Sequence, residues 1–415
     1  MENLDDFNMK SKKPWEVEGV EWREVGLKDL VKKPKGIQRG PWGGQIKKEI
    51  FVNSGYPVYE QGNVIRNNFT DFRYFLTKEK FDEFKNYHVK PGDFLITSAG
   101  TMGVIREIHD FAPIGVINQA LIRIRINKNK IISSYFLLYF NCIIERVKEE
   151  YSKGSAMKNL VSVKVLEQLS FIIPFCNGNP DLETQKKIVE YIEANFSRID
   201  KILEKKKKEL EQLDELWESV LEQAFKPKEG EEWREVRFNE LISKEKYQVG
   251  KVKVRNSLTD SGKIPVVDQG QELIRGYLDN EELKYRGPLP LIIFGDHTKV
   301  MKFIDFLFIV GADGVKILIP NEDLVCPKYF YWLLRTVKLP EKGYARHFKF
   351  LKQALYLIPF RNNQPDLEKQ KEIANYLDSV YEKIKTLKEK NQKQIAQLEE
   401  MKESILDEMF NHENK

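Results

Sequence analysis

The 415-residue sequence lacks the features that mark a membrane protein or a secreted protein. No apolar run reaches the ~18 residues that a membrane-spanning helix needs, and residues 1–13 are polar, unlike a secretion signal. The three cysteines, Cys142, Cys176 and Cys326, lie far apart in apolar surroundings. This spacing excludes a disulfide framework and a zinc cluster, and it predicts buried thiols in a reducing cytoplasm.

Catalytic signatures are also lacking. The sequence has no glycine-rich phosphate loop followed by Lys-Ser/Thr, no G-x-G-x-x-G after a strand and no G-x-S-x-G elbow. Pro180, Asp181 and Glu183 superficially resemble a nuclease carboxylate set. We interpret them as a helix start, because the helix dipole stabilises acidic side chains there and their spacing is too tight for a metal site. Asn179-Pro180-Asp181-Leu182 is a weak match to an amino-methyltransferase loop, because the second proline and the aromatic are missing. We therefore expect neither a metal nor a catalytic site in this chain.

Charge is present in quantity but unevenly distributed. Hydrophobic residues make up 41% and charged residues 32%, with a formal net charge of +5. Residues 1–180 carry 27 Lys and Arg against 21 Asp and Glu, and residues 226–360 carry 23 against 18, whereas residues 181–225 and 361–415 are acidic. A basic surface suits a polyanion because each neutralised phosphate releases counterions. Such a charge is also ordinary for a cytosolic domain, so charge alone leaves both interpretations open.

The strongest signal is an internal repeat. Residues 180–225 align without a gap to residues 365–410, with 19 identities in 46 positions. Weaker matches precede them, such as Ile-Pro-Phe before each copy and Trp-Arg-Glu-Val near the start of each half. The sequence therefore predicts two diverged globular halves, each followed by a preserved tail.

Both tails have the pattern of long helices with a heptad-like apolar seam. The seam of the first tail is Ile188, Ile192, Asn195, Ile199, Leu203, Lys206, Leu210, Leu213, Trp217 and Val220. That of the second is Ile373, Leu377, Val380, Ile384, Leu387, Asn391, Ile395, Leu398 and Ile405. The polar Lys206 and Asn391 occupy equivalent seam positions, which lowers stability but fixes register. We expect the two helices to pack as an antiparallel coiled coil.

The globular halves have the pattern of mixed α and β structure. Strands are expected at residues 94–97, 120–126, 291–294 and 306–310, and helices at 134–150 and 327–337. The expected fold class is α+β, with two mixed α/β domains in pseudo-twofold tandem, separated by the two helices. The expected boundaries are a first domain at 1–179, a helix at 180–225, a linker at 226–231, a second domain at 232–364 and a helix at 365–415.

Basic and amide side chains on the expected loops are the candidates for ligand contact, because Arg and Lys suit phosphate or guanine and Asn and Gln suit adenine. In the first half they are Lys32, Lys33, Lys35, Arg39, Lys47, Lys48, Gln61, Asn63, Ser98, Thr101, Asn118 and Gln119. In the second half they are Lys244, Lys246, Lys251, Lys253, Arg255, Gln269, Gln271, His297, Thr298, Lys299, Arg346 and His347. Any one loop is equally well explained as a solvated turn, but the recurrence of such loops in both halves favours DNA contact.

The motifs resemble, in their order, the specificity subunit of a type I restriction-modification system over essentially the whole chain. They are Ile-Pro-Phe…Pro-Asp-Leu-Glu-x-Gln-Lys at 173–186 and 358–371, Pro-Val-Val-Asp-Gln-Gly at 265–270, Phe-Gly-Asp-His-Thr at 294–298 and Gly-Ala-Asp-Gly-Val at 311–315. Asn-Gln-Ala at 118–120 stands where the second half has Ala-Asp-Gly at 312–314. Recognition loops vary strongly in this family, so the motifs do not assign base contacts.

The resemblance implies a non-catalytic subunit that reads a bipartite, asymmetric DNA site, with one recognition domain for each half-site and the helices as a ruler. It implies double-stranded DNA, two modification subunits and restriction or translocase subunits as partners, and no membrane. The chain would bind no cofactor itself. S-adenosylmethionine, ATP and Mg would belong to the partner subunits, which methylate adenine and drive translocation.

Two other classes of function stay open on the sequence alone. One is a nuclease or methyltransferase with its own site in an unrecognised form. The other is a coiled-coil scaffold that binds only protein. Steep loss of DNA affinity with rising salt distinguishes a DNA reader from a scaffold.

Overall fold

The computed structural model describes residues 13–16, 19–41, 45–46, 48–152, 162–245, 247, 250–252, 258–311, 314–340 and 346–410, with the backbone alone at 145–152, 251 and 410. The chain forms two compact units. Unit 1 is Met1–Leu203 with Ala396–Lys415, and unit 2 is Glu204–Ile395. Both long helices, α6 (Leu182–Ala224) and α10 (Leu367–Phe410), therefore contribute residues to both units.

Unit 1 is mixed α and β. Its strands are β1 (Glu21–Gly26), β2 (Ile37–Arg39), β3 (Tyr56–Tyr59), β4 (Phe75–Leu76), β5 (His88–Val89), β6 (Phe94–Thr97), β7 (Ile105–Glu107), β8 (Gly115–Ile117), β9 (Leu121–Ile124), β10 (Ser170–Cys176) and β11 (Asn179–Pro180). Its shorter helices are α1 (Leu27–Leu30), η2 (Lys48–Ile50), α2 (Gln61–Ile65), α3 (Lys78–Glu83), η3 (Lys85–Tyr87), α4 (Ser133–Ser152) and α5 (Val163–Leu166). The strands form sheets ordered β4-β3-β8-β5, β2-β9-β6-β7 and β1-β10-β11.

Unit 2 repeats this plan. Its strands are β12 (Glu232–Arg237), β13 (Lys251–Val252), β14 (Pro265–Val267), β15 (Gly276–Tyr277), β16 (Leu291–Gly295), β17 (Met301–Ile304), β18 (Ile309–Gly311), β19 (Val315–Leu318), β20 (Leu355–Arg361) and β21 (Gln364–Pro365). Its shorter helices are α7 (Phe238–Leu241), η5 (Glu281–Leu283), α8 (Pro327–Arg335) and α9 (Phe348–Gln353). The sheets are ordered β13-β18-β14-β15, β17-β16-β19 and β12-β20-β21.

Strand register confirms the internal repeat at the level of single residues. Trp22 pairs with Pro174 between β1 and β10, and Trp233 pairs with Pro359 between β12 and β20. In both units a parallel strand pair lies among antiparallel ones, β3 with β8 in unit 1 and β14 with β18 in unit 2, where β13 also pairs with β18 in parallel. The tyrosines that begin the matching helices also agree, because Tyr135 donates to the Ile172 carbonyl at 2.8 Å and Tyr329 to the Leu357 carbonyl at 3.1 Å. The two units are therefore built on one plan.

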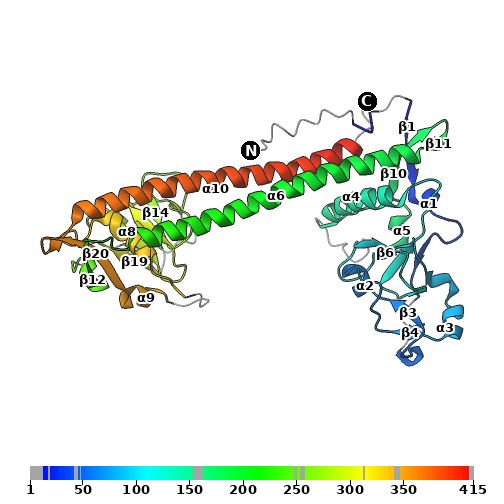
Figure 1. Ribbon diagram of the computed structural model, residues 1–415, viewed down its shortest axis with the longest axis horizontal. Coiled ribbons are helices and arrows are strands. Elements are labelled where there is room, and N and C mark those ends of the chain that lie inside the picture. The colour runs from blue at the N-terminus through cyan, green and yellow to red at the C-terminus, as the bar shows by residue number, and fades with distance from the viewer. Residues whose placement is uncertain are drawn as a thin grey trace. The chain divides into compact units, whose positions relative to one another are not determined.

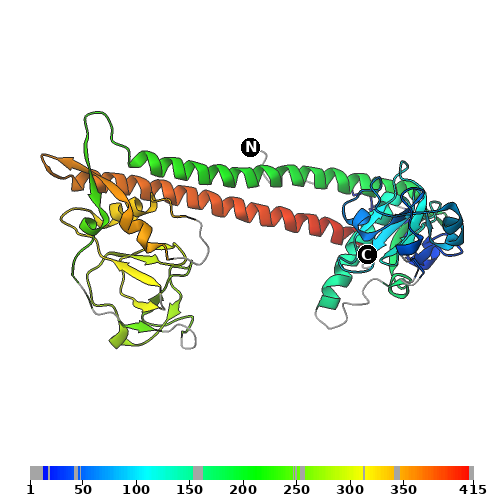
Figure 2. The same cartoon turned by 90° about the horizontal axis from the view of Figure 1, so that it is seen from below.

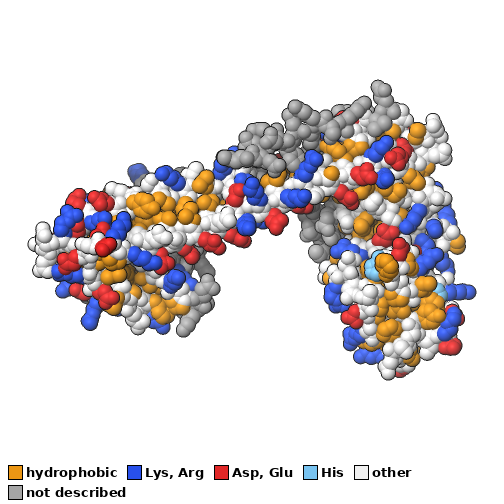
Figure 3. All heavy atoms as spheres, in the orientation of Figure 1, with side chains coloured by type: hydrophobic (Ala, Val, Ile, Leu, Met, Phe, Trp, Pro, Cys, Tyr) orange, Lys and Arg blue, Asp and Glu red, His pale blue; other side chains and the backbone are white. Residues whose placement is uncertain are grey.

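The two long helices pack against each other in antiparallel fashion, and they lie side by side in both views (Figures 1 and 2). Within unit 2, Lys206 bonds Asn391 at 3.2 Å and Trp217 packs on Tyr381 at 5.0 Å, so rising numbers on α6 meet falling numbers on α10. Acidic and basic side chains are interspersed along the visible face of the two helices (Figure 3). This confirms the predicted antiparallel coiled coil with charged flanks.

The polar seam position closes into a small network across the two helices. Lys206 Nζ donates to Glu209 at 2.9 Å and to Asn391 Oδ1, and Asn391 Nδ2 donates to Glu209 at 3.2 Å. Leu387, predicted in the seam, is instead 49% exposed, which is a correction. Its neighbour Lys388 pairs with Asp214 across the helices, so polar contacts occupy this stretch of the seam.

The start of each long helix is joined to its own unit by a buried glutamine. The Gln185 amide accepts from the Ile132 N–H at 3.0 Å and donates to the Lys130 carbonyl at 3.1 Å. Gln370 does the same with the Cys326 N–H at 2.8 Å and the Leu324 carbonyl at 3.1 Å. These glutamine clamps satisfy loop backbone just before α4 and α8, where lost hydrogen bonds would be costly.

Asp181 and Asp366 act as the N-terminal caps of the two long helices. Each Oδ1 accepts a backbone N–H three residues on, from Thr184 and Lys369, at 3.0 Å in both cases. This confirms that the repeated Pro-Asp-Leu-Glu marks a helix start.

Two further expectations were wrong in detail. Cys176 is exposed, and Cys142 and Cys326 are partly exposed, so they are not the buried thiols predicted. Cys176 ends β10 beside a turn in which Asn177 and Gly178 have positive φ, and this places its side chain at the surface. The strand expected at 306–310 begins only at Ile309, and the one expected at 120–126 spans Leu121–Ile124.

Among the described residues, none of the helices combines the length and the apolar character needed to cross a membrane.

Candidate nucleic-acid interface

The β3–β8 pair in unit 1 and the β14–β18 pair in unit 2 are parallel, so the segments that follow both strands of a pair lie at the same edge of the sheet. In unit 1, β3 ends beside β8, so Glu60 and the start of α2 at Gln61–Asn63 lie next to Asn118. They line a hollow of about 530 Å³, whose lining is Glu60, Gln61, Gly62, Asn63, Arg66, Asp71, Arg73 and Asn118. Lys48 and Gln119 border a smaller adjoining hollow of about 180 Å³. The structure thus brings together amides and cations that are separate in the sequence.

Two further loops reach the same edge of unit 1. Arg39 Nε, at the end of β2, donates to the Gln119 carbonyl at 3.3 Å. Gly100, on the β6–β7 hairpin loop, has a φ of +56°, and a Cβ there would lie 3.2 Å from Nε2 of Gln61. Thr101 is exposed on this loop, whereas Ser98 at its start is buried. Gln61, Thr101, Gln119, Arg39 and Lys48 therefore form one accessible group of candidates.

Asn63 is not accessible, which corrects its assignment as a candidate contact. It is 4% exposed, its Oδ1 accepts from the Glu60 N–H at 2.9 Å, and its Nδ2 donates to the carbonyls of Asn68 and Asp71. Its amide thus caps the start of α2, the helix that carries Gln61. Asn118 also organises backbone, because its Oδ1 accepts from the Ala120 N–H at 3.0 Å.

Unit 2 assembles the corresponding edge from the loop after β14, the β16–β17 turn and the start of α9. Thr298 Oγ1 donates to the Gln269 carbonyl at 2.6 Å, and the His297 N–H donates to Gln269 Oε1 at 3.4 Å. Gly314 has a φ of +88°, and a Cβ there would lie 2.8 Å from the Gln269 amide. Gln269 therefore holds the loops together, while Gln271 and Thr298 are exposed beside it.

Asp296 ties the β16–β17 turn to α9. Its carbonyl accepts from the His347 N–H at 2.8 Å, and its Oδ1 accepts from the Phe348 N–H at 2.9 Å. His347 is fully buried, so it does not contact DNA directly, which corrects its assignment. Its neighbour Arg346 is exposed and remains a candidate.

Four predicted lysines lie at the opposite end of these sheets. Lys32 follows Val31, which bridges Ile126 beyond β9, and Lys244 follows the Ile242–Pro320 bridge beyond β19. Both bridges lie past the ends of β9 and β19, whereas the candidate loops meet at the starts of these strands. Lys33 pairs with Asp29, and Lys35 donates to Asn86 at 2.9 Å. The structure does not bring Lys32, Lys33, Lys35 and Lys244 together with the loop candidates.

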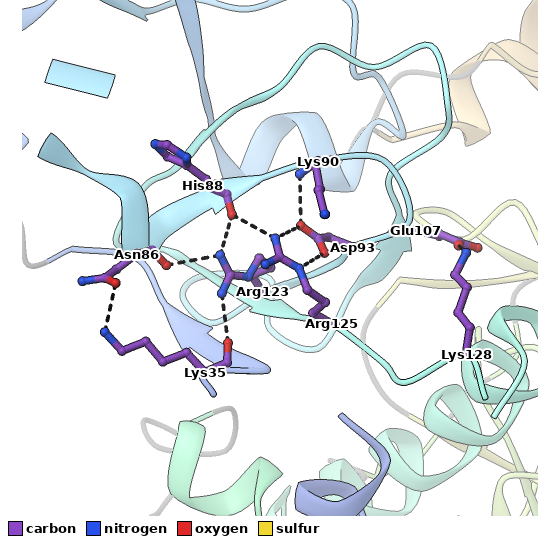
Figure 4. A network of polar contacts seen from close by, with 9 residues as sticks. All are labelled: Lys35, Asn86, His88, Lys90, Asp93, Glu107, Arg123, Arg125 and Lys128. Atoms are coloured by element: carbon purple, nitrogen blue, oxygen red, sulfur yellow. Dashed lines mark hydrogen bonds and ion pairs between the residues drawn. The ribbon is translucent and has the colours of Figure 1, made fainter. Parts of the chain in front are cut away.

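A network of buried cations explains the basic character at this far end of unit 1 (Figure 4). Arg123 is 3% exposed and donates to the carbonyls of Lys35, Asn86 and His88. Burial, and then the nearby Arg125 cation, lower the pKa of Arg123 to about 10. Arg125 forms a two-point ion pair with Asp93 at 2.6 and 2.7 Å. Both arginines thus bind groups of unit 1 itself, and the buried Arg123 is not accessible to a ligand.

Lys47, Lys246, Lys253 and Arg255 lie outside the described residues, and Lys251 is described only as backbone in β13. Sequence reasoning missed Arg66 and Arg73, which line the unit 1 hollow, and Lys328 and Arg335, which line a hollow in unit 2. No sequence signal distinguishes these four from ordinary helix and loop cations. Only the folded loops place them beside the candidates.

Among the described residues, no three His, Cys, Asp or Glu side chains gather in a way that could hold a metal ion.

Comparison with known proteins agrees with this architecture. Residues 19–212 match the family described as the type I restriction modification DNA specificity domain. The fold matches a chain from a structure described as "Structural basis underlying complex assembly and conformational transition of the type I R-M system", with a TM-score of 0.64 and 17% identity over 95% of this chain and 98% of that one. It also matches the HsdS subunit from Thermoanaerobacter tengcongensis, with a TM-score of 0.53 and 18% identity over 97% and 99% of the two chains.

The family match and the fold together support a DNA sequence-specificity subunit. The family match covers the first half, and the repeat in sequence and register extends the same plan to the second half. Residues 19–212 thus match the type I restriction modification DNA specificity domain, and the chain as a whole has the fold of the two solved chains.

Proposed function

We propose that each unit reads one half of a bipartite, asymmetric DNA site through its loop edge. One observation carries this proposal: the same loops recur on the same parallel strand pair in both units, but with different accessible side chains. Unit 1 offers Gln61, Thr101 and Gln119, whereas unit 2 offers Gln271, Thr298 and Lys299. Amide and cationic side chains can discriminate bases in the major groove. Two alike frames with different contacts suit two different half-sites.

In this role the chain carries no chemistry of its own. It positions adenine methyltransferase (modification) subunits, and restriction or translocase subunits, on the DNA. Two modification subunits would match two reading units. S-adenosylmethionine, ATP and Mg act in those partners, and the complex works on DNA in the cytoplasm. One of the matched chains comes from a structure that concerns complex assembly of a type I R-M system, which supports such partners.

Exchange of one reading unit tests the proposal. Residues 1–174 are replaced by the equivalent segment of another family member, and the chain is expressed with its partner subunits. Methylation-sensitive sequencing of the host DNA should then show one new half-site and one unchanged half-site. A change in both half-sites, or in neither, contradicts the assignment of one half-site to each unit.

A further inference from the structure

The hollow of unit 2 that Lys328 and Arg335 line borders the loop edge but is not part of it. Its volume is about 900 Å³, and it lies between the β16–β17 hairpin, α8 and the part of α10 that belongs to unit 2. The rim shared with the loop edge consists of Gln271, Thr298 and Lys299. The opposite wall holds Lys328, Tyr331, Trp332, Arg335 and Tyr381.

The opposite wall combines cations with aromatic faces. The Arg335 guanidinium lies 5.3–5.6 Å from the ring centres of Tyr331, Trp332 and Tyr381, and it donates to the Tyr331 hydroxyl at 2.8 Å. Lys328 lies 4.3 Å from the ring centre of Phe303. Stacking of this kind fixes the direction of a guanidinium, so less side-chain entropy is lost when it binds an anion.

The fold does not require these side chains. The matched hydroxyl contacts of Tyr135 and Tyr329 align α4 with α8. On that alignment unit 1 has Ser134, Leu137, Leu138 and Asn141 where unit 2 has Lys328, Tyr331, Trp332 and Arg335. The equivalent helix of unit 1 thus forms with none of these cations.

The balance of charge in this hollow is positive. Lys299, Lys302, Lys328 and Arg335 face two acids, Asp378 and Glu382. Asp378 is occupied, because it accepts from Trp332 Nε1 at 2.8 Å and pairs with Lys328 at 3.4 Å. Lys302 is also occupied, since it donates to the carbonyls of Asp268 and Glu272. Arg335 forms no ion pair with any carboxylate in the described part of the chain, so it retains charge for a ligand.

We infer that this hollow binds phosphates of the DNA backbone that flank the bases contacted by Gln271 and Thr298, with Arg335, Lys328 and Lys299 as the contacts. The inference rests on the proposed function, because the DNA must already lie across the loop edge of unit 2. Charge-assisted bonds from Arg and Lys to phosphate are strong and independent of base sequence. The hollow therefore adds affinity and positions unit 2 without reading bases.

Salt dependence of DNA binding tests the inference on the full-length chain. Affinity is measured by fluorescence anisotropy across a salt series. One labelled duplex carries the target sequence found by methylation-sensitive sequencing, and the other carries a scrambled sequence. Each lost phosphate contact should lower the slope of log K against log salt by about 0.9. For R335A and K328A we expect this loss and a weakening of several-fold, equal on both duplexes. R335K should recover most of the slope.

The matched control is K371A, an exposed lysine of α10 that pairs with Glu368 outside the hollow, and it should leave the slope unchanged. Thermal unfolding of each variant checks the fold. Unchanged slopes in R335A and K328A, with salt-dependent binding by the wild type, overturn the inference alone. Unchanged DNA binding with weaker co-purification of the modification subunit would identify a protein contact and also overturn it. Absence of salt-dependent binding by the wild type overturns the proposed function as well.

Discussion

The two units fill one strand position in opposite ways. Arg123 on β9 pairs with Leu95 in unit 1, and Ile317 on β19 pairs with Ile293 in unit 2, so the two positions are equivalent. Arg123 is buried and bonds three backbone carbonyls, whereas Ile317 packs on an apolar cluster around Ile293. The difference teaches that the strand frame is set by register and backbone pairing. Either a cation that donates to three carbonyls or a hydrocarbon side chain then completes the same frame.

The largest expected loss of stability comes from removing the glutamine clamp that the two units share. Gln185→Leu and Gln370→Leu each remove a buried amide that satisfies one part-buried N–H and one part-buried carbonyl. We expect each to destabilise its own unit by about 2–4 kcal/mol, because unsatisfied buried groups lose their full desolvation cost. Urea unfolding with a probe in each unit measures this. Lys186→Ala and Lys371→Ala, on the exposed faces, are controls, and clearly unequal effects of the two clamps would contradict the shared plan.

The next largest loss of stability is expected at the strand position where unit 1 has Arg123 and unit 2 has Ile317. Arg123→Met leaves the carbonyls of Lys35, Asn86 and His88 without their donor, and we expect a loss of about 2 kcal/mol. Ile317→Met at the equivalent position conserves volume and should cost less than about 1.5 kcal/mol. Equilibrium unfolding of both variants makes the comparison. If Ile317→Met lost more stability than Arg123→Met, the hydrogen bonds of Arg123 would not be the larger contribution at this strand position.

The polar part of the helix seam should yield a smaller effect of the opposite sign. Lys206→Leu combined with Asn391→Leu replaces a half-buried polar contact by apolar packing, and we expect a gain of about 1 kcal/mol. Asn391→Leu alone should be destabilising, because Lys206 and Glu209 lose a partner. Thermal unfolding separates the cases. A double variant no more stable than Asn391→Leu alone would show that the polar group is not a stability cost.

The smallest effect is a dependence on pH that comes from one carboxylate of unit 2, Glu231, which has no counterpart in unit 1. The Lys228 N–H, the Lys369 ammonium and the Trp233 indole hold the pKa of Glu231 at about 2. The folded pKa lies below the unfolded one, so the stabilisation is complete above pH ~4.5 and is lost as pH falls toward 2. Glu231→Gln should lower stability by about 0.5 kcal/mol at neutral pH, since the exposed pair is screened. Val20 and Thr184 replace Glu231 and Lys369 in the first repeat.

Unfolding midpoints at pH 6 and pH 3 measure that difference, with Glu232→Gln as the neighbouring control. The difference between wild type and Glu231→Gln should be smaller at pH 3 than at pH 6, because part of the stabilisation is lost above the folded pKa of about 2. Equal gaps at both pH values would mean that the carboxylate contributes nothing specific.

Much of the architecture could be predicted from the sequence, because repeats and helical seams are local patterns. The alignment at an offset of 185 residues carries both helices, their Asp caps and the buried Gln185 and Gln370. The site was only partly accessible to such reasoning. A loop amide such as Asn63 or His347 at the start of α9 looks available in sequence, yet backbone packing buries both. Conversely, Arg335 becomes a candidate only when α8 meets the β16–β17 hairpin.

Unit 1 contains residues from both ends of the sequence, and this affects how the chain folds during synthesis. Leu398, Ile405 and Met409 of α10 are almost fully buried, and Lys402 pairs with Asp200 of α6 within that unit. During synthesis, the N-terminal part of unit 1 therefore emerges from the ribosome without its α10 segment. That segment becomes available only after unit 2 has emerged. Until then the apolar residues of α6 that pack on α10 lack their partner helix. Translation speed and early chaperone binding should therefore influence the yield of native protein.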